Sequence, residues 1–91
     1  MTDTEVQAPK IEFPQTDYPI KVISDTGVGN KDEIIDIVKK YASINDERID
    51  ERLSSNGKYT TIQLHIVATD QDQLYNINSA LRATGFVHMV L

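Results

Sequence analysis

Two histidines, His65 and His88, are the side chains best suited to acid–base chemistry or metal binding. Imidazole titrates near neutral pH and is a common metal ligand, so each histidine is a candidate functional residue. The apolar alternation described below places both on one side of a β-sheet, two strand spacings or ~10 Å apart. Lys21 is the residue expected between them, and it does not complete a ligand set for a metal. The sequence therefore predicts two exposed sheet histidines and no metal site.

A glycine-containing loop is the second candidate site, with the sequence Asp25-Thr26-Gly27-Val28-Gly29-Asn30. Glycines let a ligand approach the backbone, and the helix expected after the loop offers free N–H groups to an anion or carboxylate. The segment lacks the third glycine of a dinucleotide-binding fingerprint and the Gly-Lys-Ser/Thr of a P-loop. Two interpretations stay open: a plain strand-to-helix connector, or a small-molecule site.

No catalytic constellation is visible. None of the acidic residues is expected in an apolar pocket suited to acid–base work, and no Ser/His/Asp set stands out. An acylphosphatase-like activity would need an arginine at the first loop, but the arginines are Arg48, Arg52 and Arg82. The chain has no cysteine, which excludes disulfides and thiolate metal sites. We therefore predict a non-enzymatic protein without a cofactor.

The composition of this 91-residue chain argues against two classes of binding partner, nucleic acids and membranes. A net charge of −5 removes the electrostatic attraction on which nucleic-acid binding depends. An RNA-recognition surface would need aromatics on its third strand, where Tyr59 stands alone. The N-terminus has no secretory signal, and no apolar run approaches the ~20 residues that span a bilayer. We expect a cytoplasmic protein that binds neither nucleic acid nor membrane.

Period-two alternation predicts strands over residues 18–24, 47–54, 59–68 and 86–91. In the third of these, Ile62, Leu64 and Ile66 share the buried face. Asn56-Gly57 before it predicts a type I′ hairpin turn, which needs two residues with positive φ. The last strand is almost wholly apolar. We expect its residues Val87, Met89 and Leu91 to point inward, which leaves His88 outward.

Helical spacing of apolar residues predicts a first helix over residues 31–42. Asn30 and Glu33 have the spacing of a capping box at its start. A second helix should begin after Thr69 or Asp70 as its N-cap. Gly85 is placed to end that helix in the left-handed conformation.

This order of elements predicts an α+β fold, a ferredoxin-like βαββαβ sandwich in which two helices cover one face of a four-stranded antiparallel sheet. The first and third strands should be central. We expect a flexible N-terminal tail over residues 1–17 and the folded domain over residues 18–91. The second face of the sheet should stay open.

The open face and the last strand are the surfaces left for a partner. The second strand is expected at one edge and carries charges, whereas the last strand, at the other edge, carries none. It could pair with another chain or a second copy, or it could be too short to do so, or be covered by the N-terminal tail. The expected partner-binding residues are Lys21, Ile23, Gln63, His65, Phe86, His88 and Val90.

Several short motifs over about residues 12–91 resemble the YbeD family of small bacterial proteins, sometimes labelled lipoate regulatory proteins. They are Phe13-Pro14, Tyr18-Pro19-Ile20-Lys21-Val22, Asn56-Gly57-Lys58-Tyr59, Ala68-Thr69 and Met89-Val90-Leu91. The resemblance implies an ACT-like ferredoxin fold and a link to lipoate metabolism. ACT domains commonly form dimers and bind small effectors near the first strand-to-helix loop, here residues 25–30.

Together these observations predict a regulatory or adaptor domain that acts by binding a protein partner. The alternative is an ACT-like homodimer that senses a small molecule such as an amino acid, with the ligand at the first strand-to-helix loop.

Overall fold

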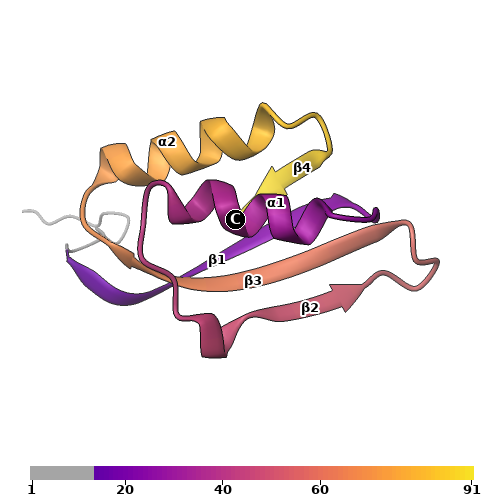
Figure 1. The fold of residues 1–91 in the computed structure, drawn as a ribbon, viewed down its shortest axis with the longest axis horizontal. Coiled ribbons are helices and arrows are strands. Elements are labelled where there is room, and N and C mark those ends of the chain that lie inside the picture. The colour runs from indigo at the N-terminus through magenta and orange to yellow at the C-terminus, as the bar shows by residue number, and fades with distance from the viewer. Residues whose placement is uncertain (1–13) are drawn as a thin grey trace, which may run out of the picture.

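The computed structural model describes residues 14–91. The predicted β-α-β-β-α-β order is confirmed (Figure 1). The elements are β1 (Gln15–Asp25), α1 (Asn30–Lys39), a short 3₁₀ helix (Asp46–Arg48), β2 (Asp50–Leu53), β3 (Tyr59–Ala68), α2 (Gln71–Arg82) and β4 (Val87–Val90). β1 begins three residues before the predicted Tyr18, and the rest of the expected tail, residues 1–13, lies outside the described residues.

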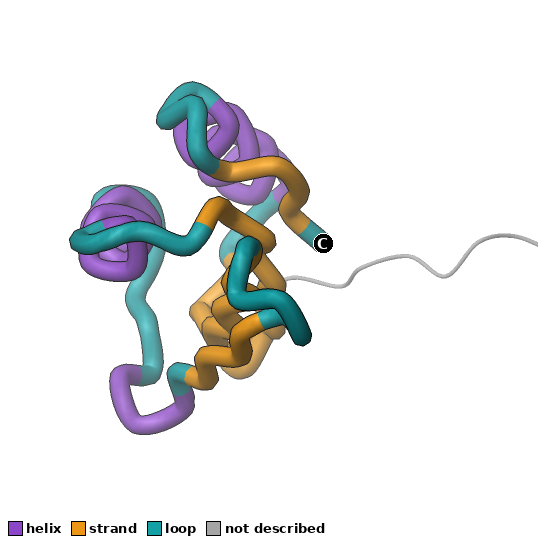
Figure 2. The backbone as a smooth tube through the Cα atoms, turned by 90° about the vertical axis from the view of Figure 1, so that its right-hand side faces the viewer, coloured by secondary structure: helices purple, strands orange, loops and turns teal. Residues whose placement is uncertain are grey.

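The strands form one antiparallel sheet in the order β2-β3-β1-β4, with β1 and β3 in the centre as predicted. Figure 2 shows both helices on the same side of the strands. This is the ferredoxin-like arrangement expected from the sequence, and within residues 14–91 both α-helices leave the other side of the sheet open.

The core lies between the sheet and the two helices. Ile62, Leu64 and Ile66 of β3 are no more than 1% exposed, which confirms their predicted inward direction. They belong to one apolar cluster with buried side chains from the other elements, namely Ile20, Val22, Ile34, Val38, Ile77, Leu81 and Val87. Period-two alternation thus decides which side of the sheet the helices cover.

The two helices begin in different ways. α2 follows the prediction, because the Asp70 carboxylate accepts a hydrogen bond from the Gln73 N–H at 2.8 Å. The capping box predicted for α1 is wrong: Asn30 is already helical, and Gly29 precedes it in the left-handed conformation. The Asn30 side-chain amide instead donates to the Asp25 carbonyl at 2.9 Å, which ties the helix to the end of β1.

The β2–β3 hairpin is present, but its predicted turn type is wrong. Gly57 has a positive φ whereas Asn56 does not, so the pair cannot form a type I′ turn. The Gly57 N–H donates to the Ser54 carbonyl, and the Asn56 side-chain oxygen accepts from the Lys58 N–H. A type I turn followed by a left-handed glycine therefore joins the strands.

β4 departs most from expectation. Ile23 pairs with Met89 but Ser24 pairs with Val87, so His88 is an extra residue that forms a β-bulge. The bulge reverses the inward–outward alternation of the β4 side chains that follow it. Val87 faces the core as predicted, but Met89 lies beside Ile23 on the open face. The predicted inward direction of Met89 and Leu91 is therefore wrong.

Candidate functional site

The centre of the open face is a shallow hollow across β1, β2 and β3, with Leu91, the residue after β4, at its edge. Lys21 pairs with Gln63, and Ile23 pairs with Thr61. Leu91 lies beside Lys21, because the two residues exchange backbone hydrogen bonds at 2.8 and 3.0 Å. The hollow has a volume of about 520 Å³ and is lined by these residues together with Asp50, Glu51 and Arg52 of β2. We call this lining the open-face hollow.

Apolar side chains and charged side chains of both signs share this hollow and its rim, because Asp50 and Glu51 line it together with Lys21 and Arg52. Leu91 is 66% exposed, and Met89, on the neighbouring β4, is 44% exposed. Lys21 and Arg52 are exposed, and among residues 14–91 neither side chain has an ion-pair or hydrogen-bond partner. Other cations are paired, for example Lys31 with Glu51 at 3.4 Å. The face therefore holds charge and apolar surface that the described residues leave unsatisfied.

His65 closes one end of the open face, where it is buried and 7% exposed. The prediction of an exposed histidine is wrong here, because Asp17 contacts the ring and Arg48 in turn binds Asp17. The His65 Nδ1 lies 3.0 Å from the Asp17 Oδ1 without the geometry of a hydrogen bond. These three side chains join the start of β1 to the 3₁₀ helix.

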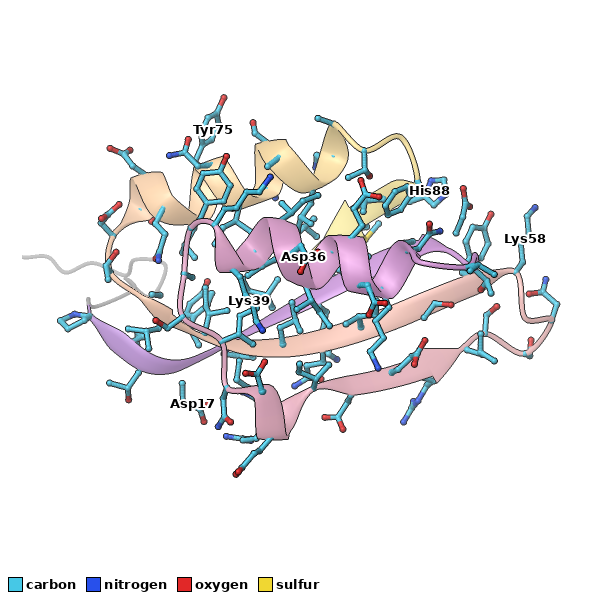
Figure 3. The ribbon with its side chains drawn as sticks, viewed as in Figure 1. Asp17, Asp36, Lys39, Lys58, Tyr75 and His88 are labelled. Atoms are coloured by element: carbon cyan, nitrogen blue, oxygen red, sulfur yellow. The ribbon has the colours of Figure 1, made fainter. Side chains whose placement is uncertain are left out.

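His88 lies at the other end of the face and is exposed, as predicted (Figure 3). Its Nε2 is 2.7 Å from the Asp25 Oδ1, and its ring meets Tyr59 edge-to-face at 5.5 Å. His65 pairs with Pro19, whereas His88 lies beside Asp25, six residues further along β1. The histidines are thus ~20 Å apart by strand rise, twice the predicted separation. In residues 14–91 no group of three or more His, Cys, Asp or Glu side chains is placed to hold a metal.

The glycine loop borders a separate cavity of about 290 Å³ on the helix side of β2. The Thr26 and Thr60 hydroxyls bond each other at 2.7 Å in its wall. Of the predicted loop, Asp25, Thr26, Gly27 and Asn30 line this cavity, whereas Gly29 does not and Val28 is fully exposed. Sequence reasoning missed the remaining lining residues, which are Ser24, Lys31, Glu51, Leu53, Thr60 and Ile62. Most of them come from β2 and β3, which only the sheet order brings to the loop.

Two of the partner-binding residues predicted near the last strand, Phe86 and Val90, do not lie exposed on the open face. Val90 pairs with Val22 and, like Phe86, is partly buried against the core. The open-face residues Lys21, Ile23 and Gln63 do lie together, and β4 adds Met89 and Leu91 to them. The bulge at His88 carries no clear sequence signal, so these two residues were missed.

Comparison with known proteins assigns the chain to a family. The sequence profile of a family described as "Protein of unknown function (DUF493)" matches residues 8–91. The chain belongs to this family. A UPF0250 protein of Pseudomonas fluorescens (strain Pf0-1) is 90% identical over the full length of both chains, and one of Pseudomonas syringae pv. syringae is 63% identical over the full length of both. The resemblance to the uncharacterised YbeD family is confirmed.

Solved structures share the DUF493 fold. Protein HP0495 from H. pylori covers all of this chain, which spans 96% of HP0495, with a TM-score of 0.71 and 14% identity. The ACT domain from GTP pyrophosphokinase of Chlorobium tepidum covers 84% of this chain, which spans 97% of that domain, with a TM-score of 0.65 and 22% identity. These likenesses confirm the ACT-like fold. Within residues 14–91, no helix has the length and apolarity needed to cross a membrane.

Proposed function

We propose that this DUF493 chain is a non-enzymatic regulatory or adaptor domain that binds a protein partner through the open face of its sheet. The observation that supports this most is the open-face hollow, which is lined by exposed Leu91, by the unpaired cations Lys21 and Arg52, and by the carboxylates Asp50 and Glu51. A hollow with apolar and charged groups but no catalytic set is suited to recognition.

The energetics of the face favour binding over a structural role. Apolar surface contributes about 25 cal/mol for each Å² removed from water, so covering Leu91 and Met89 would be favourable. The likeness to an ACT domain attached to GTP pyrophosphokinase is consistent with a regulatory role.

A pull-down with matched variants tests this proposal. Met89→Asp places a charge on the open face, and Tyr75→Asp places one on the far side of α2, where Tyr75 points into solvent (Figure 3). We expect wild type and Tyr75→Asp to enrich the same protein from lysate, with at least about tenfold less recovered by Met89→Asp. A partner lost with Tyr75→Asp but kept with Met89→Asp would contradict the proposal.

A second candidate function is an ACT-like homodimer that senses a small molecule, supported by the 290 Å³ cavity at the glycine loop. Lys31 and Glu51 supply opposite charges in its lining, and Leu53 and Ile62 supply apolar surface. This chemistry suits a zwitterion such as an α-amino acid, although the ligand would have to separate the Lys31–Glu51 pair.

Thermal shift against amino acids and lipoate separates this candidate from the first. A ligand of the cavity should raise the Tm of the wild type, and Thr60→Val should weaken the effect because it removes a hydroxyl from the wall. Light scattering should then report a dimer. A monomer that no ligand stabilises would exclude the sensing homodimer, and it would also remove support for a lipoate link.

A further inference from the structure

We propose that two copies of this chain pack together through their open faces, related by a twofold axis that runs across the strands of the sheet. The occupant of the open face is then a second copy of the same chain. This self-association stands independently of the proposed function, whereas its effect on an outside partner rests on it. The order of charged and apolar side chains on the face carries the proposal.

Two parallel rows of side chains cross the open face, and neighbours within a row are paired between adjacent strands. The first row, from β2 to the end of the chain, is Asp50, Gln63, Lys21 and Leu91. The second row, from β2 to β4, is Arg52, Thr61, Ile23 and Met89. Each row therefore has a charged residue at its β2 end and an apolar residue at its β4 end.

The charged ends of the two rows have opposite signs. Asp50 and Arg52 are two residues apart on β2, so their side chains leave the same face of the strand ~7 Å from each other. Both are exposed, and among residues 14–91 neither has an ion-pair or hydrogen-bond partner. Glu51 between them is instead paired with Lys31 of α1 at 3.4 Å. The β2 end of the open face thus presents one anion and one cation side by side.

A twofold axis that lies between the two rows and parallel to them makes the face complementary to itself. The rotation lays the first row of one copy over the second row of the other. Asp50 then meets Arg52 of the second copy, and Arg52 meets Asp50 of the second copy, so two intermolecular ion pairs form. Packed sheets lie ~10 Å apart, which an arginine and an aspartate side chain can bridge together. An interface between identical faces requires this kind of self-complementarity.

The same rotation matches the apolar ends of the rows. Leu91 and Met89, which are 66% and 44% exposed, meet each other on both sides of the axis. Lys21 lies over Ile23, so its aliphatic stem can cover that side chain while the ammonium group extends to the nearby β4 edge. A twofold axis along the strands would instead lay β2 over β4 and place both charges on Leu91 and Met89. The side chains therefore select the axis that runs across the strands.

The size of the face predicts a weak association. Four strands spaced ~4.8 Å apart give a width of ~19 Å. Two such faces bury an area at the low end of specific interfaces, about 1,200 Å² or less in total, so we expect self-association at about 0.1 mM chain. A partner that binds the open face must separate the two copies, so its apparent affinity falls by the fraction of chains in which the face is free.

Sedimentation equilibrium of the purified full-length chain over about 0.01–1 mM tests the interface without any partner. We expect the weight-average mass to rise towards that of two chains. Asp50→Arg leaves two cations at the β2 end and Arg52→Asp leaves two anions. Each change should raise the dimer dissociation constant by about tenfold or more, because the twofold axis makes every reversal count twice.

Charge exchange supplies the decisive comparison. An equimolar mixture of Asp50→Arg and Arg52→Asp chains should associate as tightly as the wild type, because each cation again meets an anion. The double variant Asp50→Arg with Arg52→Asp should also associate by itself, since it keeps one charge of each sign on the face. This recovery also shows that the single variants are folded.

Matched controls make the same changes of net charge at α1, on the other side of the sheet. Asp36→Arg (Figure 3) and Lys40→Asp should associate like the wild type. Loss of association in the single variants without recovery in their mixture would overturn the proposal, as would a monomer at every concentration. A dimer that neither single change weakens would overturn it in favour of another interface, such as pairing of β4 edges. A negative result leaves the pull-down of an outside partner free to succeed, so the two proposals fail separately.

Discussion

The two faces of β3 differ although the same ten residues make both. On one face, Ile62, Leu64 and Ile66 are completely buried under the helices. On the other, Thr61 and Gln63 are half-buried and line the open-face hollow. The difference shows how a period-two pattern assigns stability to one set of side chains and frees the other set for recognition. Changes on the two faces should therefore have separable effects.

The largest expected effect is on the covered face. Leu64→Ala should lower the free energy of unfolding by about 2–5 kcal/mol, because it leaves a cavity among residues that cannot collapse fully. Gln63→Ala, the neighbouring change on the open face, should cost no more than about 1 kcal/mol, because it removes a half-buried amide whose Nε2 lies 3.4 Å from the His65 Nε2. Urea unfolding followed by circular dichroism measures both. Equal losses of unfolding free energy for the two variants would contradict the distinction between the covered and the open face.

The two histidine–aspartate pairs should produce an intermediate effect, which sharpens the comparison within the open face. His65→Ala should cost about 1–3 kcal/mol, since it removes a buried side chain and leaves Asp17 and Arg48 without it. His88→Ala should cost about 1 kcal/mol or less, because the His88–Asp25 pair is half-exposed. Thermal unfolding should show the larger loss of stability for His65→Ala, and the reverse order would show that the His88 end of the face is the structural one.

The smallest effect on stability is expected at Lys21, on the proposed recognition surface. Lys21→Glu should change the free energy of unfolding by no more than about 0.5 kcal/mol, because Lys21 is exposed and has no partner among the described side chains. The same variant should lose the protein partner in the pull-down. A large destabilisation would give Lys21 a structural role and weaken the distinction between the faces.

Local pattern predicted most elements but not every turn, since the capping box at Asn30 and the type I′ turn at Asn56-Gly57 are wrong. The bounds of β3, the Asp70 cap, the left-handed Gly85 and the sheet order all agree with prediction. Each depends on alternation, capping chemistry or connection rules that act over a few residues or over element order. The fold was therefore predictable, and so was the central part of the open face.

The remaining errors have a tertiary origin. His65 is buried where Asp17 contacts its ring and Arg48 in turn binds Asp17, and both residues are far from His65 in sequence. Met89 faces outward because one extra residue in β4 opposes β1, and nothing in the segment Phe86–Leu91 marks that bulge. The loop cavity needs β2 and β3 for most of its wall. These features depend on tertiary contacts that spacing along the chain does not encode.

Chemical-shift mapping of the captured partner onto the isotope-labelled chain is the most direct test of the open face as the recognition surface. We predict shifts concentrated at Lys21, Ile23, Thr61 and Met89, with α1 and α2 unchanged. Shifts concentrated on the helices, with the open-face signals unmoved, would contradict the account.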